Sequence, residues 1–293
     1  MTVVIYVILL GFSTFKNYCK QYDILESQQN SNFDPTIDEE FCYMFEQNLR
    51  NNIIRPVQMI YPIIDRSKFI FCMDCARKNI WRREFYPEYK LNRDLKDKTK
   101  DKFNVERVFK YAYNIILPNF CEEYGAHKLL CQCAEGDDII AVLTKYFLEQ
   151  NIDDKIIIIS CDKDMVQLSS DRVTIITADG MIRNPKLELE SKLKKTINQD
   201  ITASDFLLFK ILIGDTADNI PNVKPGIGPK KAFKYIQDRT LLKSLLTEDI
   251  TIADSFLRNK KLISMNEIPT DIHKLIISEL ENSIKLTKNK LNL

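Results

Sequence analysis

The sequence is poor in the residues on which several kinds of site depend. It contains only two histidines, His127 and His273, and neither has acids or cysteines around it in a metal-ligand pattern. Imidazole catalysis and histidine-rich metal sites are therefore not expected, and any metal ion would be bound by oxygen atoms. An excess of one charge is also missing, because 42 Lys and Arg residues face 41 Asp and Glu residues for a net charge of +1. A nucleic-acid function must then be inferred from where the charges lie.

Long apolar runs and a disulfide framework are missing as well. The apolar run at residues 3–10 is too short to cross a bilayer and has no Lys or Arg before it, so it predicts a buried strand and no membrane segment. The eight cysteines follow no repeated secreted pattern, which fits a reducing compartment, the cytosol or nucleus. Cys72-x-x-Cys75 and Cys131-x-Cys133 could supply four zinc thiolates, but neither pair has finger-like spacing, and buried small residues are the favoured interpretation.

Apolar runs and amphipathic segments alternate along the chain. Strands are predicted at residues 3–10, 69–73, 128–131, 155–160 and 172–177, and helices at 13–22, 38–49, 103–124 and 205–213, with one opened by residues 135–138 and several after 241. Thr202 suits the N-cap of the helix at 205–213, whereas residues 186–199 show no clear period. This alternation predicts an α/β fold with a central, mainly parallel sheet flanked by helices.

Acidic residues follow the predicted strands. Asp74 ends the strand at 69–73, and Asp162 and Asp164 follow the strand at 155–160. In an open α/β sheet the carboxyl ends of parallel strands meet at one edge, so these carboxylates are expected to lie together. Three further acids open the next predicted helix: Glu135, Asp137 and Asp138. The helix dipole alone favours acids there by ~0.3–1 kcal/mol each, so an ordinary helix start is the alternative interpretation.

The segment at residues 77–110 concentrates positive charge, with twelve basic against six acidic residues. Within residues 81–93, basic and aromatic side chains alternate, as contact with phosphates and stacking on bases require. Residues 94–102 alternate charges without apolar anchors, which predicts a solvated, mobile segment or an exposed helix. The residues expected to bind nucleic acid here are Arg82, Arg83, Tyr89, Lys90 and Arg93.

The most informative stretch is Gly-Asp-Thr-Ala-Asp-Asn-Ile-Pro at residues 214–221, with Gly-Ile-Gly-Pro-Lys-Lys at 226–231. Asp215 and Asp218 stand three residues apart and can share one cation. Backbone N–H groups of a glycine turn can face a phosphate, and the turn opens a basic helix start. The residues expected to contact it are Gly226, Gly228, Lys230 and Lys231. A capped turn between two core helices is the alternative.

Taken in order, these motifs resemble those of the 5′-3′ exonuclease and flap endonuclease family, of the phage type and of the N-terminal part of DNA polymerase I. The matching motifs are Tyr-Lys-x-Asn-Arg at 89–93, Glu-x-Asp-Asp at 135–138, Ser-x-Asp-x-Asp at 160–164 and Asp-x-x-Asp-Asn at 215–219 with the following Gly-x-Gly. The resemblance covers about residues 69–236. It implies a PIN-like nuclease core at residues 1–204 with a helical arch at about 82–110, and a C-terminal helix-hairpin-helix DNA-binding domain at 205–293.

The resemblance also implies the chemistry. Two or more Mg²⁺ ions, with Mn²⁺ as a substitute, are expected to bind eight carboxylates: Asp74, Glu135, Asp137, Asp138, Asp162, Asp164, Asp215 and Asp218. Lys90 and Arg93 are expected to be catalytic, positioning the scissile phosphate and offsetting its charge. The expected function is a metal-dependent, structure-specific 5′-nuclease that hydrolyses DNA at 5′ ends or flaps in replication or repair. The expected partners are branched or 5′-ended DNA and replication proteins, with a monomeric chain and a potassium ion at the hairpin.

Two departures from the family pattern keep other functions open. The family usually ends its first strand with an Asp, where this chain has Leu10, and the spacing before Gly226 holds one residue more than usual. A lost ligand predicts weakened metal binding, so a catalytically weakened, structure-specific DNA-binding protein is one alternative. A PIN-like ribonuclease is another, which the hairpin after Asp218 disfavours because such ribonucleases generally lack it.

Overall fold

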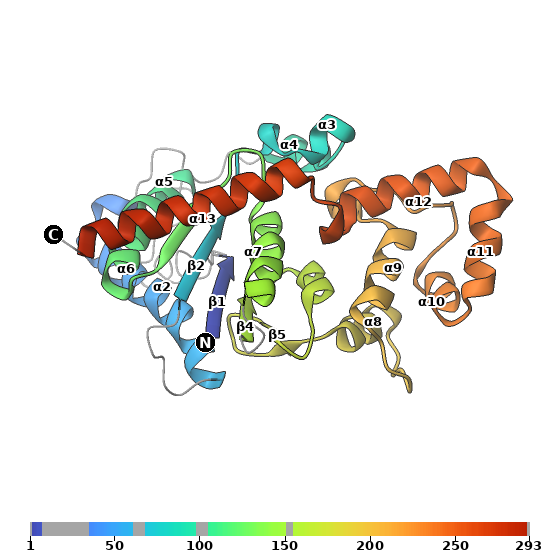
Figure 1. Cartoon of the computed structure of the whole chain (residues 1–293), viewed down its shortest axis with the longest axis horizontal. Coiled ribbons are helices and arrows are strands. Elements are labelled where there is room, and N and C mark those ends of the chain that lie inside the picture. Colours follow the sequence, from blue (N-terminus) through green and yellow to red (C-terminus); the bar gives the residue numbers. More distant parts are fainter. Residues whose placement is uncertain (1, 8–34, 61–67, 98–104, 151–154, 292–293) are drawn as a thin grey trace.

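The fold was taken from a computed structural model of the chain, which describes residues 2–7, 35–60, 68–97, 105–150 and 155–291 (Figure 1). Leu10, the helix expected at 13–22 and the outer part of the expected arch, residues 98–104, lie outside these ranges. No helix among the residues described is both long and apolar enough to span a bilayer.

Six strands in the described ranges form one sheet in the order β3-β2-β1-β4-β5-β6. Their bounds are β1 Thr2–Val7, β2 Lys68–Met73, β3 His127–Leu130, β4 Lys155–Ile159, β5 Val173–Ile176 and β6 Ile182–Arg183. The first five pair in parallel, and only β6 runs antiparallel, beside β5. The predicted α/β class is confirmed, and β6 is a strand that the sequence did not indicate.

Alternate residues of the central strands point into two separate cores. On one face, Phe69 and Phe71 of β2 and Ile157 of β4 contact α2 (Glu39–Ile60), α5 (Val105–Tyr111) and α6 (Leu117–Tyr124). On the other face, Ile70 and Ile158 contact α7 (Gly136–Gln150) and α13 (Thr270–Leu291). Both faces are covered, which explains why the strands read as continuous apolar runs.

Two predicted helices differ in extent from the observed ones. The helix expected at 38–49 continues to Ile60 and carries Pro56 inside it. The single helix expected at 103–124 is divided, because a π-helical segment, Ala112–Ile116, separates α5 from α6. Such a segment inserts an extra residue into the helical repeat, which shifts the buried face and which apolar periodicity alone does not reveal.

Five helices form a second, separate core. They are α8 (Pro185–Leu193), α9 (Ala203–Ile213), α10 (Pro229–Gln237), α11 (Arg239–Glu248) and α12 (Ile250–Ile263). Leu193, Phe209 and Phe233 lie at its centre. Thr202 caps α9 in a reciprocal capping box with Asp205, as the sequence predicted.

The expected division of the chain at residue 204 does not match this packing. α8 precedes that boundary yet belongs to the second core through Leu189 and Leu193. α13 follows it yet returns to the sheet, where Ile272 and Ile276 share a core with Leu129 of β3. Figure 1 shows α13 crossing from the group of α8–α12 back over the sheet. An apolar stripe on a helix requires a partner, and β3 with α7 provides that partner.

The remaining short helices lie in the connections and carry much of the site. They are α3 (Arg82–Phe85), α4 (Leu91–Asp97), and 3-10 helices at Pro35–Ile37, Arg77–Asn79, Lys163–Leu168, Thr216–Asp218 and Met265–Glu267.

Candidate active site

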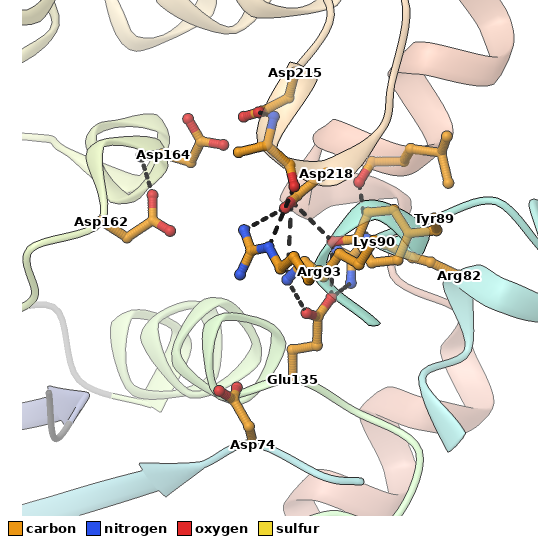
Figure 2. A network of polar contacts seen from close by, with 12 residues as sticks. Asp74, Arg82, Tyr89, Lys90, Arg93, Glu135, Asp162, Asp164, Asp215 and Asp218 are labelled. Atoms are coloured by element: carbon orange, nitrogen blue, oxygen red, sulfur yellow. Dashed lines mark hydrogen bonds and ion pairs between the residues drawn. The ribbon is translucent and has the colours of Figure 1, made fainter. Parts of the chain in front are cut away.

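A pocket of about 320 Å³ lies at the carboxyl ends of the parallel strands. Seven of the eight predicted carboxylates line it: Asp74, Glu135, Asp137, Asp162, Asp164, Asp215 and Asp218. Lys90 and Arg93 line it as well, and Figure 2 shows both among the acids. The structure therefore brings together residues that are up to 144 positions apart, from Asp74 to Asp218.

Asp74 is positioned by the end of β2 and the start of α7. Its Oδ1 accepts a hydrogen bond of 2.7 Å from the backbone N–H of Gly136, at the positive end of the α7 dipole. A Cβ at residue 136 would lie 3.2 Å from both Asp74 Oδ1 and the carbonyl oxygen of Cys72. Glycine at this position thus allows the helix to begin close to the end of the strand.

Asp162 and Asp164 are placed by the turn that follows β4. The backbone N–H of Asp162 donates to Ser160 Oγ at 3.0 Å, and the N–H of Asp164 donates to Asp162 Oδ1 at 2.7 Å. Asp162 thereby caps the 3-10 helix Lys163–Leu168. The Ser-x-Asp-x-Asp spacing is a capping arrangement that directs both carboxylates to the edge of the sheet.

Asp215 and Asp218 lie on a loop closed by two backbone hydrogen bonds. The N–H of Asp215 donates to the carbonyl of Ile220 at 2.8 Å, and the reverse bond measures 2.7 Å. Gly214, with φ 69° and ψ −165°, makes the turn from α9 into this loop, a conformation open essentially to glycine alone. The loop carries both acids into the pocket.

Two lysines lie between pairs of these acids. Lys210 Nζ is 2.6 Å from Asp215 Oδ2 and 3.0 Å from Asp164 Oδ1. Lys90 pairs with Glu135, and its Nζ lies 3.8 Å from Asp218 Oδ2. Sequence reasoning missed Lys210, although a lone lysine inside the apolar helix Ala203–Ile213 was a usable signal.

The electrostatics of the pocket favour a bound cation. Burial raises the pKa of Asp137 well above its usual range, and the neighbouring Asp162 and Glu135 raise it further. Burial also raises the pKa of Asp164 to about 6, against the opposing effect of Lys210. Ionised carboxylates crowded in this way need positive charge among them.

The donor set fits a hard divalent ion, because it is made of carboxylate oxygens with waters available to complete it. Among the residues that the structure describes, no three of these acids are arranged so that they could hold one metal ion together.

Asp138, which was expected to be a metal ligand, does not line the pocket but lies in an internal position. Its side chain is fully buried and forms a bidentate pair with Arg82, at 2.7 and 2.8 Å. Its Oδ2 also accepts hydrogen bonds from Trp81 Nε1 at 3.0 Å and from the backbone N–H of Glu135 at 3.1 Å. All of its acceptor capacity is used inside the protein, which ties α3 to the start of α7.

Arg82 and Tyr89 were expected to contact DNA, and the structure gives both an internal position instead. Arg82 is 5% exposed and donates a third strong hydrogen bond, of 2.8 Å, to the carbonyl oxygen of Leu262. Tyr89 is 3% exposed, and its hydroxyl lies 3.0 Å from Glu135 Oε2 and 3.3 Å from Asp218 Oδ2. An alternation of basic and aromatic residues cannot distinguish side chains that face solvent from those that support the site.

Arg83 is also held within the protein. Its Nη2 lies 2.6 Å from Asp94 Oδ2, and Arg77 Nη1 lies 2.7 Å from the other oxygen of the same carboxylate. These two arginines hold the pKa of Asp94 below its usual range. The three side chains fasten α4 to α3 and to the 3-10 helix Arg77–Asn79 before it.

The segment that carries Lys90 is bonded to the loop that carries Asp218. Asn219 Nδ2 donates to the carbonyl oxygen of Glu88 at 2.9 Å, and the backbone N–H of Lys90 donates to the carbonyl of Asp218 at 2.9 Å. Asn92 Nδ2 donates to the carbonyl of Thr216 at 2.8 Å. Arg93 pairs with the Asp218 carboxylate. The conformation of this segment and the position of the acids are therefore linked.

Three cysteines of the two pairs are buried, as the sequence interpretation favoured. Cys72, Cys75 and Cys131 are buried, and burial raises the pKa of the Cys75 thiol to about 12. Burial likewise raises the pKa of Cys133 to about 11.

The glycine turn lies in a separate hollow, outside the pocket. Gly226 has φ 80°, and Gly228 precedes α10 as its N-cap. Lys230 and Lys231 are exposed on the first turn of that helix. The assignment of these residues to DNA binding stays a prediction.

A parallel-sheet α/β fold with a carboxylate pocket at its carboxyl edge, and with basic side chains at the pocket, defines a protein of the metal-dependent nuclease class. Residues 45–199 match the family model described as 5′-3′ exonuclease, N-terminal resolvase-like domain. A 5′-3′ exonuclease of Buchnera aphidicola from Schizaphis graminum is 30% identical over 230 residues, which cover 75% of this chain and 73% of the relative. The chain belongs to the 5′-3′ exonuclease family.

Other relatives are longer proteins or more distant ones. The thermostable DNA polymerase I of Thermus thermophilus is 27% identical over 200 residues, covering 65% of this chain and 22% of the polymerase. The T5 5′-exonuclease with bound zinc has the same fold, with a TM-score of 0.61, 19% identity, and coverage of 96% of this chain and 99% of that one. A bacteriophage T5 flap endonuclease complex with DNA and metal ions superposes with a TM-score of 0.58 at 18% identity, covering 96% and 98%.

Proposed function

We propose that this chain hydrolyses phosphodiester bonds at 5′ ends or flap junctions of DNA, with Mg²⁺ as its cofactor and Mn²⁺ as a substitute. The observation that carries the proposal is the pocket itself, in which seven carboxylates lie with Lys90 and Arg93 at the carboxyl edge of the sheet. Family membership supports the reaction. The T5 relatives, described with metal ions and with DNA, support the cofactor class and the substrate.

The chain's own residues divide the work between cation binding and phosphate binding. Asp74, Asp137 and Asp162 on the sheet side, and Asp164 and Asp215 on the side of α9, are the residues that would hold divalent ions. Ions held by these residues would supply polarisation of the scissile phosphate and a lower pKa for the attacking water. Their requirement for oxygen ligands matches a donor set without histidine or thiolate.

Lys90 and Arg93 bind the scissile phosphate in this proposal. Both side chains face the pocket and are paired with Glu135 and Asp218 (Figure 2). A phosphate oxygen offers the same kind of charge-assisted hydrogen bond, and the planar guanidinium of Arg93 can hold two such oxygens. The hydrogen bonds between this segment and the loop at 216–219, donated by the Asn92 and Asn219 amides and by the Lys90 N–H, hold both groups near the acids.

The test is a 5′-labelled flap substrate incubated with and without Mg²⁺ and resolved for product length. Asp162→Asn should lower the rate by several orders of magnitude, because it removes a ligand charge, while DNA binding remains measurable. Asp254→Asn makes the same chemical change at an exposed position of α12, outside the pocket, and should leave the rate unchanged. Full activity in EDTA would refute the proposal, and DNA binding without cleavage in Mg²⁺ or Mn²⁺ would replace it with a DNA-binding function.

The proposal also includes a role in DNA replication or repair and a potassium ion at the glycine turn. Related sequences lie within DNA polymerase I, which supports a role in DNA replication or repair. A potassium ion at the Gly226–Gly228 turn would strengthen duplex binding there, so replacing K⁺ by a larger quaternary ammonium ion at equal ionic strength should weaken the binding of a DNA duplex.

A further inference from the structure

A second hollow, of about 460 Å³, separates the end of α8 from the glycine turn. One wall is formed by Lys192, Leu193 and Lys194, and the other by the turn and the start of α10: Gly226, Gly228, Pro229, Lys230 and Lys231. Four lysines thus line the hollow, and no acid does. In a chain whose total charge is only +1, this is a strongly one-sided arrangement.

The helix dipole explains the position of only one of these four lysines. Lysines in the last turn of a helix interact favourably with its dipole, by about 0.3–1 kcal/mol each, which accounts for Lys192. The same rule disfavours Lys230 and Lys231 in the first turn of α10. Like charges collected from two elements repel one another, so their convergence indicates an anionic partner that is absent from the chain itself.

The two walls are held together by a common core. Leu189 and Leu193 of α8 share an apolar cluster with Ile227 of the turn and Phe233 of α10. Lys195 Nζ lies 4.8 Å above the Phe233 ring, which fastens the segment after α8 to α10. The hollow is therefore preformed, and a ligand that enters it does not have to order the walls first.

The lining favours the backbone of a duplex over a single strand. Proteins that bind single strands stack bases on exposed aromatic rings, and no aromatic residue lines the hollow. Phe233, the ring that packs beneath it, is only 5% exposed. Lysines and backbone N–H groups contact phosphates without regard to sequence.

We propose that the C-terminal end of α8 is the second wall of a duplex-binding groove, in which Lys192 and Lys194 contact backbone phosphates of the duplex that also contacts the glycine turn. This inference rests on the proposed function, since it names the surface that holds the duplex part of the substrate. It adds residues that no sequence motif indicated, because residues 186–199 have no clear period.

The same helix also touches the metal-ligand turn. Glu188 of α8 pairs with Arg183, and its Oε2 lies 3.4 Å from Lys163 Nζ, between Asp162 and Asp164 in sequence. A duplex held at the end of α8 is thus placed at a fixed distance from the pocket. The groove can therefore contribute to the selection of the bond that is cut.

The test compares two double variants of the full chain. Lys192→Ala with Lys194→Asn removes both charges, and asparagine tolerates the left-handed backbone of residue 194, which has φ 54°. Lys274→Ala with Lys285→Asn makes the matched change at exposed positions of α13. The affinities for a DNA duplex and for a single strand of equal length are measured in EDTA at salt concentrations from about 50 to 200 mM.

For the α8 variant, the slope of log duplex affinity against log salt concentration (the salt slope) should decrease in magnitude by about 0.9 per lost phosphate contact, or roughly 1.8 in total. Duplex affinity should be about tenfold to a hundredfold weaker near 0.1 M salt. Single-strand binding should change no more than in the α13 variant. Lys192→Arg with Lys194→Arg should restore the slope. Equal slopes for the α8 and α13 variants would overturn the groove while leaving the nuclease proposal intact, whereas a wild-type chain that cleaves no DNA overturns the nuclease proposal itself.

Discussion

The buried pair of Arg82 and Asp138 offers the sharpest test of the corrected site. Sequence reasoning placed Arg82 on DNA and Asp138 on a metal ion, while the structure pairs the two away from both. Arg82→Met keeps most of the side-chain volume and removes the charge. The main effect of Arg82→Met is expected to be a loss of stability rather than of DNA affinity.

The magnitude follows from the burial of both partners. Their side chains are 6% and 0% exposed, and Arg82 Nη2 lies 2.7 Å from Asp138 Oδ1. Burial opposes the charge of Arg82, yet the adjacent Asp138 carboxylate outweighs this and raises the pKa of Arg82. Removing one partner leaves a buried charge without compensation, which costs about 3–5 kcal/mol. For a chain of 293 residues that is a decrease in Tm of roughly 5–8 °C.

The assay is denaturant unfolding, with Arg83→Met as the control. Arg83 and its partner Asp94 have side chains 18% and 30% exposed, so breaking their pair should cost only ~0–1 kcal/mol. Arg82→Met with Asp138→Leu should recover part of the loss, because it removes the stranded charge. A loss below about 1 kcal/mol for Arg82→Met, together with a salt slope for DNA binding reduced by about 0.9, would show that Arg82 contacts phosphate after all.

Three further outcomes are expected. Asn219→Ala removes the bond to the carbonyl oxygen of Glu88 and should lower kcat about 10- to 100-fold with a smaller change in KM, as single-turnover kinetics would show. Gly214→Ala would place a Cβ 2.3 Å from the carbonyl oxygen of Ile220 at φ 69°, so unfolding experiments should show a loss of at least about 1–3 kcal/mol. The Asp94 carboxyl has a lowered pKa, so its ion pairs should persist above about pH 4 and be lost as the pH falls further; an NMR titration should show this midpoint rising when either arginine partner becomes alanine.

The sequence predicted those parts of the fold and site that depend on local pattern. β2, β4 and β5 are apolar runs bounded by polar residues, and each was found within two residues of its expected position. Asp74, Asp162 and Asp164 were expected at one edge of the sheet because parallel strands place their carboxyl ends there. The Gly-x-Gly stretch at 226–228 was expected to form a turn, and Gly226 has φ 80°, a backbone conformation that favours glycine.

The sequence could not show in which direction each side chain points in the folded protein. Asp137 and Asp138 are adjacent on the first turn of α7, so they point about 100° apart, and only one can face the pocket. Both carry the same functional group, and no local rule selects between them. α13 presents a similar problem, because its apolar stripe is visible in the sequence but the surface that receives it, formed by β3 and α7, is more than a hundred residues away.

Lys90 and Lys210, which lie between pairs of the acids, link the binding of metal to the binding of substrate. Burial opposes the charge of Lys90 and Lys210, yet the neighbouring acids raise the pKa of both, so each remains a cation at neutral pH. When Lys90 also contacts a phosphate, it shares its charge between that phosphate and Glu135, so the Glu135 carboxylate lies among other acids with less compensation. A divalent ion restores the balance, so metal and DNA should each favour the binding of the other. Because such coupling is reciprocal, the factor by which Mg²⁺ tightens DNA binding should equal the factor by which DNA lowers the Mg²⁺ concentration for half-saturation.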